Sequence, residues 1–145
     1  MCSNKRGEEK ASHIVSAWSK EDGFCLGQKA VKEKSNEITA IPELLEKIQI
    51  KGQIITIDAM GTQTAIAGKI RQKRADYVLA LKKNQYIMYE DVKEYFSNEE
   101  FQKEMREKGA YKKTCEKAHG QIEIREYYQT EDIRWLSQKK NWKGL

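Results

Sequence analysis

The sequence predicts an α/β fold, and three observations support that prediction. The chain has 145 residues, which is enough for one domain with its own core. Two short apolar runs, 53–58 and 75–83, alternate with segments whose apolar residues recur at helical spacing. A hairpin pattern stands on either side of this alternation. The predicted order is therefore ββ, then α-β-α-β-α, then ββ, which is an α/β domain with an antiparallel hairpin attached.

The first predicted element is a β-hairpin. The run "HIVSAWSK" (13–20) is rich in β-forming residues, and "EDG" (21–23) is typical of a tight turn. The run 24–33 then alternates between apolar and polar residues. Its apolar face holds Phe24, Leu26 and Ala30.

The middle of the chain alternates helices and strands, and a second hairpin follows. The strand at 75–83 is a continuous apolar run, the type that lies in a sheet covered on both faces. Residues 90–107 hold seven acids and three bases, which predicts a solvated helical stretch with a loop. The remaining predicted elements are helices at 34–50, 62–74 and 84–96, a strand at 53–58, and a hairpin within 110–130.

The composition indicates which kind of binding partner and which cell compartment to expect. The net charge is +5 and the pI is about 9.0, which mildly favours a polyanionic partner. The three cysteines are scattered and form no metal-ligand spacing, so we expect reduced thiols in a cytoplasmic protein. The longest apolar run, 77–81, is far too short to span a membrane, and residues 1–12 form a polar segment without a signal-peptide core.

Polar side chains follow both predicted strands at their carboxyl ends. Asp58 follows the first strand, and Lys82, Lys83, Asn84 and Gln85 follow or end the second. Ligands of open α/β sheets gather at this edge. If the strands are adjacent and parallel, the set suits a divalent cation and a phosphate backbone. The alternative is that Asp58 caps the next helix and that the lysines are solvated.

Six motifs resemble a known family in order and in content. "HIVSAW", "LGQ", "EKSNEITAIPELL", "TIDAMGTQ", "ADYVLALKKNQ" and "HGQIEIR" are similar to segments of insertion-sequence transposases of the H-repeat-associated, ISAs type. The resemblance covers residues 13–145. It implies a DDE transposase with an RNase H-like fold, in which three carboxylates hold two divalent metals, Mg²⁺ or Mn²⁺, for DNA strand cleavage and transfer. Asp58 corresponds to the second carboxylate.

This chain departs from the family pattern in ways that matter for activity. The family's first aspartate lies before the start of this chain and its third carboxylate lies beyond residue 145, so the resemblance implies truncation at both ends. The first, central strand would then be missing between the strands 13–20 and 53–58. The family also more often has Cys, Gly and Arg where Thr62, Lys83 and Gln121 stand.

Three functions follow as alternatives. The first is a transposase fragment that is itself inactive, with DNA and either further copies or intact transposase as partners. The second is a minimal metal-dependent nuclease using Asp58 with Glu90 or Glu94. Together with Asp91, these acids of the following helix are the candidates for a second ligand beside Asp58. The third is a non-catalytic DNA-binding or subunit-poisoning module. The predicted DNA-contacting set is Lys69, Arg71, Lys73, Arg74, Lys82, Lys83, Asn84, Gln85 and Arg125.

Five residues are also assigned structural roles. Glu123 and Arg125 alternate along a strand, which favours a charge pair over a catalytic acid. His119 is assigned to a turn. Trp135 and Trp142 are assigned to packing, with stacking on an unpaired base as the alternative.

Overall fold

The computed structural model describes residues 13–31, 37–118 and 121–145. It divides the chain into two compact units, Met1–Ala80 and Leu81–Leu145, and each is described by itself. Within the described ranges the six strands form three two-stranded sheets. The mixed α/β class is confirmed, and so is the predicted order of strands and helices. The turn assigned to His119 lies outside the described residues.

The first unit begins with the predicted hairpin. Strand β1 (His13–Trp18) pairs antiparallel with β2 (Cys25–Val31). The apolar face predicted for the second strand is the exposed one, because helix α1 (Glu37–Lys47) packs on the opposite face. Gly27 favours this close packing, since a Cβ there would lie 3.1 Å from Leu44 Cδ1, and the leucine would have to shift slightly to accept it.

A parallel strand pair completes the first unit. Strand β3 (Ile54–Ile57) pairs in parallel with β4 (Asp76–Leu79), and helix α2 (Thr64–Gln72) connects them. The core is made of residues from α1, α2 and the loops beside them, and the inward face of β3 and β4 packs on it. Its buried members are Leu45, Ile50, Ile66, Ile70 and Ala75.

The prediction that the second strand is covered on both faces is wrong for the structure described. Val78 on β4 is 60% exposed, whereas Tyr77 and Leu79 on the other face are half-buried. The reason is that α1 and α2 supply the apolar partners for one face of this sheet, and no described element of the first unit covers the other. A single mixed sheet of the RNase H type stays a prediction.

The second unit is built from helix α3 (Tyr86–Ser97), helix α4 (Glu99–Glu107) and the second hairpin. The break predicted within 90–107 falls at Asn98, whose Oδ1 accepts the backbone N–H groups of Glu100 and Phe101 at 2.9 and 3.2 Å. This is an ordinary helix cap. Trp135 stacks on Tyr95 with ring centroids 4.2 Å apart, and Trp142 is buried, so their packing roles are confirmed.

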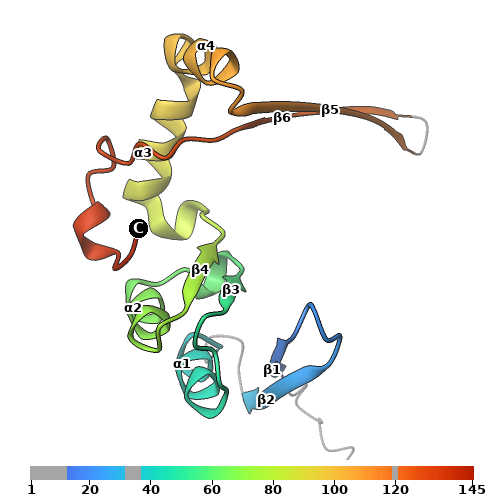
Figure 1. Cartoon of the computed structure of the whole chain (residues 1–145), viewed down its shortest axis with the longest axis vertical. Helices are drawn as coiled ribbons and strands as arrows, with labels where there is room; N and C mark the ends of the chain where they lie inside the picture. Colours follow the sequence, from blue (N-terminus) through green and yellow to red (C-terminus); the bar gives the residue numbers. More distant parts are fainter. Residues whose placement is uncertain (1–12, 32–36, 119–120) are drawn as a thin grey trace, which may run out of the picture. The chain divides into compact units, whose positions relative to one another are not determined.

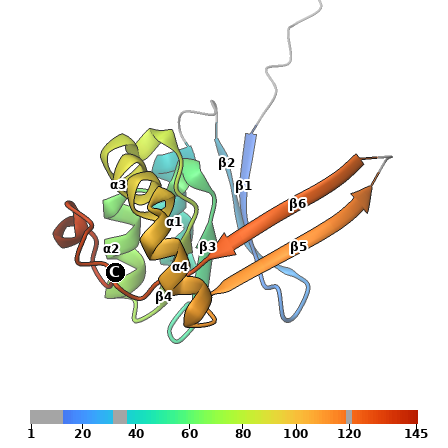
Figure 2. The same cartoon turned by 90° about the horizontal axis from the view of Figure 1, so that it is seen from above.

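The second hairpin is a long two-stranded ribbon. Strand β5 (Tyr111–Ala118) pairs antiparallel with β6 (Gln121–Tyr128) over their full length. Figures 1 and 2 both show the ribbon running away from α3 and α4, and nearly all of its described side chains are exposed. It is therefore the most solvent-accessible element of the second unit.

Candidate functional site

Asp58 stands at the carboxyl end of β3 and caps a short turn. Its backbone is extended, with φ −71° and ψ 177°, and its Oδ1 accepts the backbone N–H of Met60 at 3.1 Å. The capped element is the 3-10 turn Ala59–Gly61. Helix α2 begins after Gln63, which makes no side-chain cap. Asp58 is thus a cap, but of the turn and not of the helix that the sequence suggested.

The carboxylate of Asp58 keeps one oxygen available. The residue is exposed, and its Oδ2 has no hydrogen-bond partner within 13–31, 37–118 and 121–145. A hard oxygen at the edge of a parallel pair suits a divalent cation. However, no group of three His, Cys, Asp or Glu residues in the described ranges could hold a metal ion. The described residues therefore do not form a three-ligand metal centre, and metal binding by Asp58 stays a prediction.

Thr62 fixes the edge on which Asp58 stands. Its side chain is almost fully buried, and its Oγ1 lies 3.2 Å from the carbonyl oxygen of Asp58 and 2.5 Å from that of Ala80. The backbone N–H of Ala80 also donates to the carbonyl of Ile57 at 3.1 Å. The carboxyl ends of β3 and β4 are therefore tied together directly beneath Asp58. The sequence marked Thr62 only as a departure from the family pattern.

Gly61 explains the small-residue turn after Asp58. A Cβ at this position would lie 2.2 Å from Ile57 Cγ2 and 2.9 Å from Ile41 Cδ1, closer than real Cβ atoms approach. Only glycine therefore lets the turn pack against both β3 and α1.

The polar residues predicted to join Asp58 lie in the second unit. Lys82 precedes the 3-10 turn Lys83–Gln85, and Lys82, Lys83 and Asn84 are exposed whereas Gln85 is half-buried. Their convergence with Asp58 stays a prediction.

The acids of α3 already have contacts in the second unit. Asp91 accepts the backbone N–H and the hydroxyl of Ser137 at 2.9 and 2.6 Å, so it holds the C-terminal segment. Glu90 forms an ion pair with Lys93 at 3.7 Å, and Glu94 is exposed. The use of one of these acids as a second metal ligand stays a prediction.

Three of the four bases predicted on α2 or just after it have partners inside the first unit. Lys69 pairs with Glu46, and Arg71 pairs with Asp76. Lys73 Nζ lies 2.5 to 3.2 Å from three carbonyl oxygens at the end of α1, those of Leu45, Glu46 and Ile48. Arg74 is exposed, with φ 58°. DNA contact by these four bases stays a prediction, and Lys73 has a structural role that the sequence did not reveal.

The β5–β6 ribbon carries lysines that the sequence analysis did not single out. Arg125, predicted to contact DNA, pairs with Glu123 through two contacts of 3.0 and 2.9 Å, which confirms the predicted charge pair. Lys112, Lys113 and Lys117 are exposed and form no ion pair with any described residue. The run "YKKTCEK" gave the signal, since it places three lysines on a predicted hairpin, although the ribbon as a whole also carries three acids, Glu116, Glu123 and Glu126.

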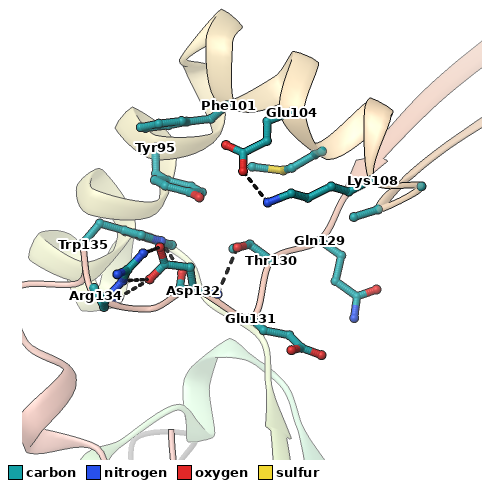
Figure 3. Close-up of a pocket in the computed structure, with 13 residues that line it drawn as sticks. Tyr95, Phe101, Glu104, Lys108, Gln129, Thr130, Glu131, Asp132, Arg134 and Trp135 are labelled. Atoms are coloured by element: carbon teal, nitrogen blue, oxygen red, sulfur yellow. Dashed lines mark hydrogen bonds and ion pairs between the residues drawn. The ribbon is translucent and has the colours of Figure 1, made fainter.

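The second unit also holds a cavity of about 1130 Å³, shown in Figure 3. Tyr95 lies in a stack between Phe101 and Trp135 at its wall. The charged lining residues are three acids and two bases, which does not favour a phosphate. Those bases are already engaged, because Lys108 pairs with Glu104 and Arg134 pairs with Asp132. The Arg134 guanidinium holds the pKa of the Asp132 carboxyl well below its usual range.

An exposed carboxylate at the edge of a parallel strand pair and exposed lysines on a β-ribbon are compatible with the class of proteins that act on nucleic acids. The family model described as the transposase DDE domain matches residues 2–141, and the chain belongs to that family. No solved structure matches this chain. No helix in the described ranges is long and apolar enough to cross a membrane.

Curated relatives support the assignment. "Putative transposase YncI" of Escherichia coli O157:H7 is 44% identical over 142 residues, which is 97% of this chain and 36% of that protein. "H repeat-associated putative transposase YbfD" of Escherichia coli K12 is 41% identical over 122 residues, which is 84% of this chain and 47% of that protein. "H repeat-associated putative transposase YhhI" of the same strain is 44% identical over 123 residues. The chain spans less than half the length of these relatives.

Proposed function

We propose that this chain, a member of a family that acts in transposition, supplies a single metal-binding carboxylate, Asp58, and does not cleave DNA by itself. The observation that supports this is the state of the two carboxylate oxygens. Oδ1 is used by the turn, whereas Oδ2 has no partner in the described ranges. A bound Mg²⁺ or Mn²⁺ would stabilise the charge that develops on a DNA phosphate during strand cleavage.

The described residues explain the proposed inactivity. A two-metal site holds its ions about 4 Å apart and needs several oxygen ligands to do so. Within the first unit Asp58 is the carboxylate at this edge, and the described ranges contain no group of three His, Cys, Asp or Glu residues that could hold a metal ion. Asp58 would therefore hold a divalent cation only weakly, and cleavage requires ligands from further transposase sequence.

Supercoiled plasmid tests this proposal. The wild-type chain with Mg²⁺ or Mn²⁺ is expected to leave the plasmid intact. The matched variant is Asp58→Asn, which keeps an oxygen for the Met60 N–H and removes only the charge. Nicking by the wild type that disappears in Asp58→Asn would contradict the proposal and favour the minimal nuclease.

A second candidate function, non-catalytic DNA binding, is favoured by the β5–β6 ribbon. A two-stranded ribbon fits the major groove of B-DNA. The register places Lys113, Lys117, Ile122 and Ile124 on one face, and both isoleucines are more than half exposed. The ribbon thus offers phosphate-binding charge beside apolar side chains that can reach base edges.

The salt dependence of DNA affinity tests the ribbon. Joint substitution of Lys113 and Lys117 by Gln is expected to reduce the log–log salt slope by about 2, since each phosphate contact contributes about 0.9. The matched control substitutes Lys93 and Lys103 by Gln. Both lysines lie on helices and form ion pairs with nearby acids. An unchanged slope in the ribbon variant, or an equal loss in the control, would count against this interface.

A further inference from the structure

Helix α4 ends directly at the root of the β5–β6 ribbon. The backbone N–H of Ala110 donates to the carbonyl oxygen of Met105 at 2.8 Å, and the N–H of Gly109 donates to that of Arg106 at 3.2 Å. Gly109 has φ 73°, the left-handed conformation that this kind of helix ending requires. Strand β5 begins at Tyr111, immediately after this turn. The ribbon therefore leaves the helix through a short, hydrogen-bonded turn.

One side chain of the helix reaches both strands of the ribbon. Arg106 Cζ lies 5.1 Å from the ring centroid of Tyr111, the first residue of β5, and 5.4 Å from that of Tyr128, the last residue of β6. The guanidinium also donates a hydrogen bond to the Tyr128 hydroxyl. The two tyrosines are register partners whose ring centroids are 5.0 Å apart. Because an aromatic face attracts a cation, Arg106 holds the ends of both strands at once.

The bonds between the helix and the ribbon are confined to this root. Apart from the contacts of Arg106, one hydrogen bond joins α4 to the described part of the ribbon, from the Tyr128 hydroxyl to Gln102 Oε1 at 3.5 Å. Tyr111 and Tyr128 are half-buried, whereas every side chain described between them except that of Thr114 is exposed. Figures 1 and 2 show the ribbon extending away from α4. An isolated two-stranded hairpin is only marginally stable, so the direction of this ribbon depends on its root.

We propose that Arg106 is a positioning residue that sets the direction of the β5–β6 ribbon relative to helix α4. Arg106, Tyr111 and Tyr128 together form the root clamp. The clamp lies on the ribbon face of Lys113 and Lys117, because alternate residues of β5 share a face. The proposal rests on the DNA-binding function proposed above only for what the ribbon contacts, since a fixed direction would hold these two lysines in place for a phosphate backbone.

The chemistry of the clamp requires arginine. A guanidinium is planar and can stack on an aromatic ring while its N–H groups donate sideways, whereas an ammonium is a compact and strongly hydrated charge. Within the described residues, the hydrogen bond and the ring contacts of the Arg106 side chain all go to Tyr111 and Tyr128. Arg106→Lys therefore keeps the net charge of the chain and loses the bridge between the two strands.

The distance between two spin labels on the full chain measures the direction of the ribbon. One label is attached to Cys115, which is exposed on β5. The other is attached to an introduced cysteine at an exposed position of α3, Lys93→Cys, and Cys2 and Cys25 are replaced by serine. Both labels lie in the second unit, so their distance is independent of how the two units are arranged. This labelled chain is expected to give one narrow distance distribution.

Arg106→Lys should broaden that distribution by about twofold or more, because the ribbon is then held less firmly at its root. Tyr128→Phe keeps the ring and loses the hydroxyl, so it should broaden the distribution less. The matched control is Arg125→Lys, because Arg125 pairs with Glu123 inside β6, and this change should leave the distribution unaltered. The proposal is overturned if Arg106→Lys leaves the width unchanged, or if Arg125→Lys broadens it equally.

Affinity for a non-specific DNA duplex separates the root clamp from the proposed function of the ribbon. Two cation–π contacts at an exposed site correspond to about a two- to fivefold change in an equilibrium constant, so Arg106→Lys should weaken binding by about that factor. Its log–log salt slope should match that of the wild type, because Lys113 and Lys117 are still present. A loss of overall stability alone would lower the unfolding midpoint without broadening the label distances well below that midpoint. Broadening with unchanged DNA affinity would support the clamp and count against the ribbon as the DNA interface.

Discussion

The hydroxyl oxygen of Thr62 lies 2.5 Å from the carbonyl oxygen of Ala80, 18 residues further along the chain. The contact joins the carboxyl ends of β3 and β4 below Asp58. Thr62→Val keeps the shape but removes the donor from this part-buried contact, so we expect a loss of about 0.5 to 1.5 kcal/mol in the free energy of unfolding. Thr62→Ser keeps the hydroxyl and should lose clearly less. Urea titration measures both, and equal losses would show that the hydroxyl is unimportant.

Lys73 should stabilise the first unit more than its surface position suggests. Its ammonium group lies 2.5 Å from the carbonyl oxygen of Leu45 and 3.1 Å from that of Ile48, where α1 leaves acceptors unpaired. Lys73→Met should therefore cost about 1.5 to 3 kcal/mol, the range for hydrogen bonds to a charged group. Lys69→Met is the control, because Lys69 forms a surface ion pair with the exposed Glu46 and should change stability little. Equal effects would contradict the capping role.

Sequence patterns predicted the helices and strands but not the contacts of Thr62 and Lys73 that join them. Periodicity identified β3, α2 and β4, because burial of one face sets the spacing of apolar residues such as Ile66 and Ile70. The same patterns cannot show that Thr62 reaches Ala80, because that contact depends on how two strands align. They likewise mark Lys73 as polar without revealing the carbonyl groups at the end of α1.

The candidate site was predicted only in part, because sequence patterns describe local spacing and not the contacts between elements. The position of Asp58 after a core strand was enough to predict its place at a strand end and its competing role as a cap. The predicted basic face was less well founded, because Glu46 and Asp76, which pair with Lys69 and Arg71, lie outside the local pattern.

Acid should weaken the first unit partly through Glu46. A hydrogen bond from Lys69 holds the pKa of this carboxyl below its usual value of 4.5. A carboxyl with a lowered folded-state pKa contributes stability above the unfolded-state value and loses it as the pH falls through the folded-state value. Because the pair with Lys69 is solvent-exposed, Glu46→Gln should flatten the decline in stability below about pH 4.5 only slightly. Parallel acid limbs in urea titrations of the variant and the wild type would show that the pair contributes nothing.

Manganese titration of the labelled chain tests most directly whether Asp58 is both a cap and a metal ligand. Paramagnetic Mn²⁺ broadens the NMR signals of nearby amides, and the wild-type chain should show this effect first at residues 57–61. Asp58→Asn retains an oxygen for the Met60 N–H, so it should keep the wild-type unfolding midpoint while the broadening disappears. Broadening that persists unchanged in Asp58→Asn, or a wild-type chain whose 57–61 signals are no more affected than those of other exposed acids, would contradict the account.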